Sequence, residues 1–123
     1  MSSIEKPGPL MATRELELVD ANGAHVRRVV VKLYKPRRMD DGEDWICNYR
    51  ILGIGGEKLR YGAGVDAIQA LLLALSIIGA ELYTSTEARA GLLKWCDTGQ
   101  LGFPIVFPEL IGAHAGDIMK LFV

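Results

Sequence analysis

Cysteine and histidine are scarce in this sequence, and their scarcity narrows the chemistry open to the protein. Only two of the 123 residues are cysteines, Cys47 and Cys96, and they lie far apart without a C-x-x-C pair. Two isolated thiols are typical of a reducing compartment, where cysteines act as small buried core residues. The two histidines, His25 and His114, have no patterned cysteine or carboxylate near them. The sequence therefore indicates no metal, no cofactor and no histidine-based catalytic site.

The chain also lacks a long hydrophobic run. Its most apolar stretch, ALLLALSIIGA, covers residues 70–80, whereas a membrane span needs about 20 apolar residues. This stretch predicts a buried helix instead. Residues 1–10 (MSSIEKPGPL) contain no apolar run, so no secretory signal is expected. We expect a cytoplasmic protein that does not contact membranes.

Neither sign of charge dominates the composition. Fourteen Lys and Arg residues face 15 Asp and Glu residues, which gives a net charge of −1. Nucleic-acid-binding domains are typically strongly basic, so the overall charge argues against nucleic acid as a partner. The length and the hydrophobic content of 50% fit one globular domain. We expect a flexible N-terminal arm over residues 1–10 and a single domain over residues 11–123.

Apolar and polar residues alternate with a period of two between residues 12 and 61, which predicts strands. A charged loop over residues 36–44 and a glycine-rich turn over residues 53–56 separate these strands. Short connections of this kind predict an antiparallel meander. The expected strands are residues 14–19, 25–35, 45–52 and 58–61, with residues 92–95 as a fifth.

The pair Asn22-Gly23 is the clearest local signal, because both residues tolerate the positive φ angles of a type I′ hairpin turn. A turn centred on this pair fixes the register of the first two strands. In that register Leu16 faces Val29, Glu17 faces Arg28 and Asp20 faces His25.

One long helix is expected after the strands. Asp66 and Gln69 form a capping-box pattern at its start, and apolar residues at helical spacing continue to about Tyr83. The remaining faces are apolar as well, which requires cover beyond the sheet from the C-terminal third, a second copy of the chain or a partner. The residues expected in the buried stripe are Ile68, Leu71, Leu72, Leu75, Ile78 and Leu82.

The C-terminal third has weaker patterns. Thr84 or Thr86 is expected to begin a short helix. Residues 101–111 are apolar but interrupted by Pro104 and Pro108, which predicts an extended segment laid over the long helix. Residues 117–122 predict one last helical turn.

Strand alternation places mostly basic residues on the sheet face turned away from the helix. Such a face is either an ordinary solvated surface or a docking surface for an acidic partner. RNA-binding sheets carry stacking aromatic residues, which this predicted set lacks, so a protein partner is favoured over RNA. The predicted outer-face residues are Glu15, Glu17, Arg28, Lys32, Asn48, Arg50, Lys58 and Arg60.

Several short motifs together carry a resemblance to a known family. Residues 61–71 read YGAGVDAIQAL, and they are followed by Ile78-Gly79 and Leu82-Tyr83. Asp44-Trp45 precedes them, and LGFP follows at residues 101–104. This set resembles a family of small uncharacterised bacterial α+β domains over roughly residues 15–104. The resemblance implies an antiparallel sheet packed on one long helix, and it implies no catalytic residues.

These observations predict a non-enzymatic α+β module that binds a protein. Its size and style are similar to those of bacterial immunity proteins that neutralise toxins, which is an analogy at the level of the fold. A small-ligand pocket between helix and sheet, lined by Trp45, Tyr49 and Tyr61, is the alternative, and a homodimer is a third. The residues expected to contact a protein partner are Asp40, Asp41, Glu43 and Asp44 in the acidic loop, and Arg28, Lys32, Arg50 and Arg60 on the sheet.

Overall fold

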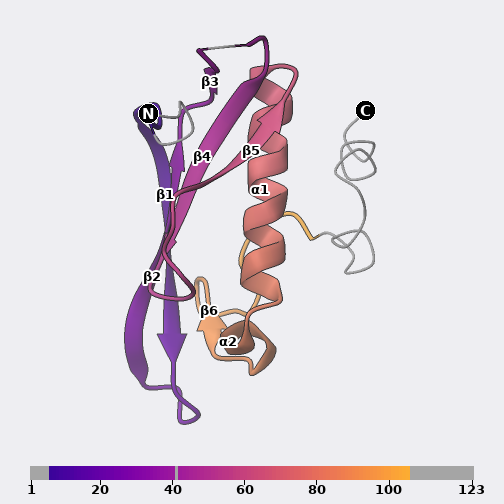
Figure 1. Cartoon of the computed structure of the whole chain (residues 1–123). Coiled ribbons are helices and arrows are strands. Elements are labelled where there is room, and N and C mark those ends of the chain that lie inside the picture. The colour runs from indigo at the N-terminus through magenta and orange to yellow at the C-terminus, as the bar shows by residue number, and fades with distance from the viewer. Residues whose placement is uncertain (1–5, 41, 106–123) are drawn as a thin grey trace.

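A computed structural model describes residues 6–40 and 42–105 of the chain. One antiparallel sheet forms the first layer, and a long helix packs against one of its faces as the second layer (Figure 1). This arrangement confirms the expected α+β architecture. The elements are β1 (Leu10–Val19), β2 (His25–Tyr34), β3 (Arg37–Arg38), β4 (Trp45–Leu52), β5 (Arg60–Gly64), α1 (Ala67–Tyr83), α2 (Thr86–Arg89) and β6 (Leu93–Lys94).

Strand β4 pairs with three other strands of the sheet, β2, β3 and β5. Tyr49 pairs with Leu33 of β2 on one edge and with Arg60 of β5 on the other. The short strand β3 continues along the β2 edge, where Arg38 pairs with Trp45. Strands β5, β4, β2 and β1 therefore follow one another as a meander, as expected. Strand β6 returns after the helices to pair with β1, which confirms the fifth strand expected near residues 92–95.

The β1–β2 turn differs from the expected type I′ turn. The backbone N–H of Gly23 donates to the carbonyl of Asp20, so Ala21 and Asn22 occupy the centre. Gly23 alone takes a positive φ, of 82°, and Asn22 does not. The Asp20 side chain explains the change, because its Oδ1 accepts hydrogen bonds from the backbone N–H groups of Asn22 and Ala24, both at 2.9 Å.

The turn also changes one end of the β1–β2 register. The expected pairs of Leu16 with Val29 and of Glu17 with Arg28 are confirmed. The ladder then shifts between Leu18 and Val19, so His25 pairs with Val19 rather than with Asp20. A three-residue loop with one left-handed glycine commonly produces such a bulge.

Helix α1 begins and ends close to where the sequence predicted. Asp66 caps it by accepting a hydrogen bond from the Gln69 N–H at 2.8 Å, and the Gln69 side chain accepts one from Val65. The second helix, α2, is short, and Ser85 caps its start.

The buried stripe of α1 differs from the expected one in its first half and middle. Ile78 and Leu82 are buried as expected, but Leu71, Leu72 and Leu75 are only half-buried, and Ile68 is 68% exposed. Ala70 and Ala74 take its place against the sheet, because a Cβ atom on Gly62 of β5 would lie 2.5 Å from the Ala74 nitrogen. Small residues on both elements therefore bring α1 close to β5, and the larger side chains of the first turn point elsewhere.

Residues 101–104 lie over α1, as expected for the start of the extended segment. Leu101 is fully buried, and its N–H donates to the Tyr83 hydroxyl at 2.8 Å. A Cβ atom on Gly79 would meet the Pro104 carbonyl at 2.2 Å, so the segment contacts the helix backbone. Residues 106–111, and the helical turn expected at residues 117–122, lie outside the described part of the chain.

The two cysteines differ in their surroundings, and both are free thiols. Cys47 is buried as expected, whereas Cys96 is exposed at the tip of a tight turn. The expectation of two buried thiols was therefore wrong for Cys96. Within residues 6–40 and 42–105, no helix has the length and apolar character needed to cross a membrane.

Candidate functional site

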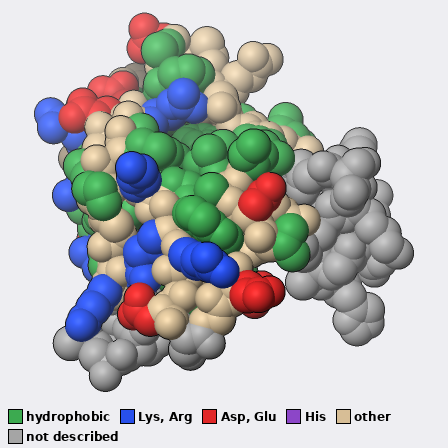
Figure 2. All heavy atoms as spheres, turned by 90° about the horizontal axis from the view of Figure 1, so that it is seen from above, with side chains coloured by type: hydrophobic (Ala, Val, Ile, Leu, Met, Phe, Trp, Pro, Cys, Tyr) green, Lys and Arg blue, Asp and Glu red, His purple; other side chains and the backbone are tan. Residues whose placement is uncertain are grey.

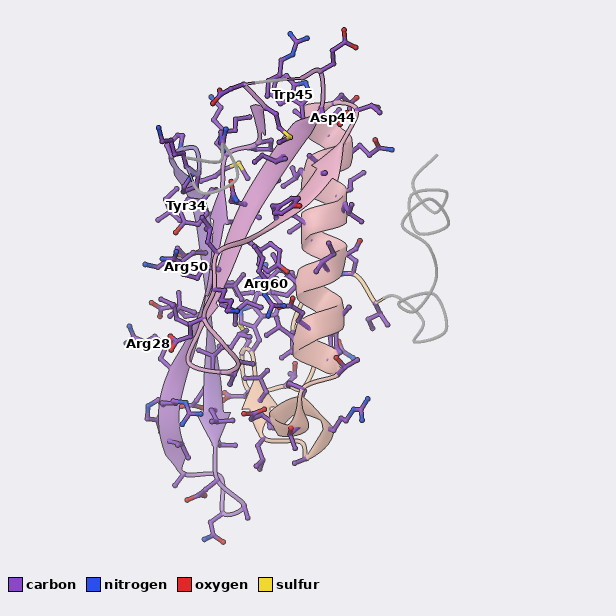
Figure 3. The ribbon with its side chains drawn as sticks, viewed as in Figure 1. Arg28, Tyr34, Asp44, Trp45, Arg50 and Arg60 are labelled. Atoms are coloured by element: carbon purple, nitrogen blue, oxygen red, sulfur yellow. The ribbon has the colours of Figure 1, made fainter. Side chains whose placement is uncertain are left out.

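The outer face of the sheet, which is the face turned away from α1, carries three of the basic residues that the sequence predicted for partner binding. Figure 3 shows Arg28, Tyr34 and Arg50 on this side. Lys32 shares it, because Lys32 is the register partner of Arg50. Figure 2 looks down on the end where α1 begins and shows Lys and Arg side chains along the margin on the side of the sheet. The predicted placement of Arg28, Lys32 and Arg50 is thus what the structure shows.

Arg60 and Tyr61 lie on the faces opposite to those predicted. Arg60 pairs with Tyr49 in the sheet, so its side chain lies on the helix side, where its guanidinium binds the Glu81 carboxylate of α1. Figure 3 shows Arg60 between the sheet and the helix. Tyr61 pairs with Asn48 and lies on the outer face, 42% exposed. The physical reason is that Gly62 must face Ala74, which fixes the parity of β5.

Lys32 and Arg50 stand directly opposite each other on the outer face, although both carry positive charge. Neither has an ion-pair partner among the described residues. Two nearby carboxylates are already used, because Glu15 pairs with Arg28 at 3.4 Å and Glu17 pairs with His25 at 3.0 Å. The face therefore has an excess of positive charge that its own carboxylates do not neutralise.

Arg37 adds a third guanidinium to this face, since its register partner is Ile46, two residues before Asn48 on β4. Its Nε and Nη2 atoms, and the Nε atom of Arg50, are buried without a hydrogen-bond partner in the described part of the chain. A buried donor left without a partner costs about 1–3 kcal/mol. Because these N–H groups are buried, they can donate to an anionic group from outside only if the two arginine side chains move.

Two tyrosines accompany the basic residues, contrary to the expectation that the outer face lacks aromatic residues. Tyr61 lies beside Asn48, and Tyr34 lies on the same side (Figure 3). Asn48 itself is 1% exposed, and its Nδ2 donates to the Arg60 carbonyl at 3.2 Å. Asn48 is therefore a buried supporting residue, and the side chains around it make the surface.

The acidic loop lies at one end of the sheet, just before β4 (Figure 3). Asp40, Glu43 and Asp44 are all exposed, while Asp41 lies outside the described residues. The loop is closed by the Met39 N–H, which donates to the Asp44 carbonyl at 2.9 Å. Across residues 6–40 and 42–105, no three His, Cys, Asp or Glu side chains gather as a metal site would require.

The alternative pocket of Trp45, Tyr49 and Tyr61 is not formed as predicted, because Tyr61 lies on the outer face. Tyr49 lies instead in the wall of a different cavity, between the turn after β4 and the corner that joins α1 to α2. Its hydroxyl donates to Glu81 Oε1 at 2.8 Å. Burial, together with the charge of Glu81, raises the pKa of Tyr49 well above its ordinary value.

Sequence reasoning missed Tyr34, Arg37 and Glu81 as residues of candidate sites. The sequence could have predicted Tyr34, because strict alternation from Arg28 through Lys32 continues to Tyr34. Arg37 and Glu81 could not be predicted. The face of Arg37 depends on a one-residue shift of register against β4 between β2 and β3, and the position of Glu81 depends on the docking of α1.

Residues 12–105 match the family described as a domain of unknown function (DUF6968), and the chain belongs to this family. The match includes β1 through β6 and both helices, so the fold described above is the fold of the matched domain apart from the first two residues of β1. No curated protein and no solved structure matches the chain.

Proposed function

We propose that this protein is a non-catalytic binding module whose outer sheet face holds an acidic surface of a protein partner. The single observation that carries the proposal is the pairing of Lys32 with Arg50 across β2 and β4. Like charges placed directly opposite each other destabilise a sheet. Within residues 6–40 and 42–105 no carboxylate pairs with either of them, and a carboxylate from a partner would relieve the repulsion.

The unpartnered guanidinium nitrogens of Arg37 and Arg50 support the same proposal. Charge-assisted hydrogen bonds to carboxylates are about twice as strong as neutral ones, and arginine can form two of them to one carboxylate. An aspartate or glutamate of a partner would satisfy these buried donors once the two side chains turn outward on binding. The free energy that these unpaired donors cost in the isolated chain would be recovered in the complex and would favour it.

Several features favour a protein over a nucleic acid as the partner. Glu15 and Glu17 lie on the same face as the basic residues, and they would repel a phosphate backbone. Tyrosine and arginine are the residue types most enriched in the energetic centres of protein interfaces, and Tyr61 provides a half-exposed tyrosine here. The acidic loop offers a second contact of opposite charge, which would orient a protein partner.

An immunity protein that occludes a toxin is the most specific form of this proposal. It rests on an analogy at the level of the fold and on the charged surfaces of the described residues. Charged docking surfaces suit such a role because complementary charges accelerate association.

The change Lys32→Glu tests the proposal because it should move binding and stability in opposite directions. It converts a repulsive pair into an attractive one, so the free energy of unfolding of the isolated protein should rise by about 0.2–1 kcal/mol. The partner is recovered by affinity purification from the source cells with wild-type protein as bait, and it is then purified. Its affinity for the variant should fall at least tenfold, measured by calorimetry.

The matched control is Arg89→Glu, which reverses an exposed charge on α2, away from the outer face. This variant should bind the partner as the wild type does. Equal affinity of both variants for the partner would disprove the proposal. Recovery of nuclease-sensitive material lost only with Lys32→Glu would show that the face binds nucleic acid instead.

A further inference from the structure

A second candidate site lies on the opposite side of the sheet, where α1 meets α2. A cavity of about 340 Å³ opens there between the Gly53–Leu59 turn and the α1–α2 corner. Figure 1 shows that the chain after β4 turns toward the end of the molecule at which α2 lies. The volume falls within the range of about 300–1,000 Å³ that is typical of small-molecule sites.

One carboxylate of this cavity is held in place by two donors. The Tyr49 hydroxyl and the Arg60 guanidinium both bind Oε1 of Glu81. Tyr49 is 1% exposed, and the charge of Glu81 is the main cause of the raised pKa of Arg60. Oε2 of Glu81 has no hydrogen bond within residues 6–40 and 42–105, and it is not among their buried unpartnered atoms. The network therefore fixes one oxygen and leaves the other able to accept a hydrogen bond.

The charges around the cavity leave it acidic. Glu81 and Arg60 pair with each other, and of the remaining charged residues in the lining Glu57 and Glu87 outnumber Lys58. Glu57 adopts a φ of 56°, a left-handed conformation that a residue with a side chain takes only at a cost of about 1–2 kcal/mol.

One part of the cavity wall is apolar, whereas Ser85 and Thr86 make another part polar. Ile51 and Ile54 line the apolar part beside the ring of Tyr49, and Ile51 also belongs to the hydrophobic core. A ligand that fits would therefore present an apolar body to these residues and a hydrogen-bond donor with positive charge to Glu81.

We propose that this cavity binds a small molecule that carries a protonated amine on an apolar body. The ammonium group would donate to Oε2 of Glu81, and the apolar body would rest against Ile51, Ile54 and the Tyr49 ring. This site is separate from the outer face, so its test does not depend on the proposed protein partner.

Three probes with nearly the same body and different head groups test the proposal: phenethylamine, 2-phenylethanol and 3-phenylpropionate. Each is titrated into the full-length protein and followed through backbone amide signals by NMR. Phenethylamine should give saturable shifts centred on Gly55, Gly56 and Thr86. The alcohol should bind at least fivefold more weakly, and the carboxylate should not bind.

Two variants and a control locate the binding. Glu81→Gln and Glu87→Gln should each weaken phenethylamine binding at least threefold, and Glu87→Gln leaves the Tyr49–Glu81–Arg60 network intact. Glu15→Gln on the outer face should leave the affinity unchanged. Equal affinities for the three probes, preferred binding of the carboxylate, or no saturable shift with phenethylamine would overturn the proposal.

Discussion

Burial in the core changes the ionisation of one side chain, the thiol of Cys47. Its thiol is buried and donates to the Tyr34 carbonyl at 3.3 Å. Burial raises the pKa of the Cys47 thiol from 9.0 to about 11. The folded protein thus holds this proton more tightly than the unfolded chain does. The stability that results is fully present below pH 9 and is lost as the pH rises toward about 11.

This linkage predicts a difference between two cysteine variants. The wild type should lose about 2 kcal/mol of unfolding free energy relative to Cys47→Ala between roughly pH 8 and pH 10.5. Cys96→Ala should keep the wild-type dependence, because it leaves the buried thiol in place. Urea unfolding at each pH measures the effect. Parallel pH curves for the wild type and Cys47→Ala would contradict the assignment.

Asp20 acts at the same scale, since one carboxylate oxygen holds the β1–β2 turn through Asn22 and Ala24. Asp20→Ala should lower the free energy of unfolding by about 1 kcal/mol, because two backbone donors lose their acceptor. Asp20→Asn keeps an acceptor oxygen and should retain most of the stability. Thermal unfolding compares the two variants, and equal losses in both would show that the oxygen does not hold the turn.

The same residue explains a limit of the sequence-based prediction. Asn22-Gly23 correctly indicated a turn. Local residue preferences alone could not show that the Asp20 side chain would stabilise a different type of turn. A type I′ turn would have placed Asn22 at positive φ, and the two hydrogen bonds to Asp20 stabilise a different centre.

At the scale of elements, the close approach of α1 to β5 decides which side chains reach which face. Gly62 and Gly64 lie against Ala70 and Ala74, with backbone atoms where side chains would otherwise be. This contact determines that Arg60 points toward the helix and Tyr61 points away. The sequence could not show which way Arg60 and Tyr61 point. Gly53, Gly55 and Glu57 in the turn before β5 have positive φ angles, and counting alternate residues through such a turn does not give the face of the next strand.

Gly62→Ala should therefore destabilise the fold by about 1–3 kcal/mol, since its Cβ would meet the Ala74 backbone and α1 would have to move. The matched control is Gly56→Ala, where a Cβ meets nothing within 4 Å and φ is not positive. It should change stability by less than about 1 kcal/mol. Urea unfolding distinguishes them. Similar small effects in both would contradict the close packing.

The whole molecule separates its two candidate sites on the two faces of one sheet. Strand alternation predicted the outer face well for β1, β2 and β4, because each of these strands is long enough for its parity to be unambiguous. It did not predict the cavity by Glu81, which exists only once the α1–α2 corner is folded beside the turn after β4. Local patterns thus specified the sheet, and tertiary packing specified the cavity.

The most direct test of the outer face as a docking surface is to ask which atoms touch the partner. A photo-crosslinking phenylalanine derivative replaces the half-exposed Tyr61 in one variant, which leaves Lys32 and Arg50 in place, and it replaces Arg89 in another. Both variants are irradiated in the source cells. We expect one dominant protein crosslink from position 61 and none to the same protein from position 89. Crosslinks to that protein from position 89 alone, or crosslinks to nucleic acid from position 61, would contradict the docking surface.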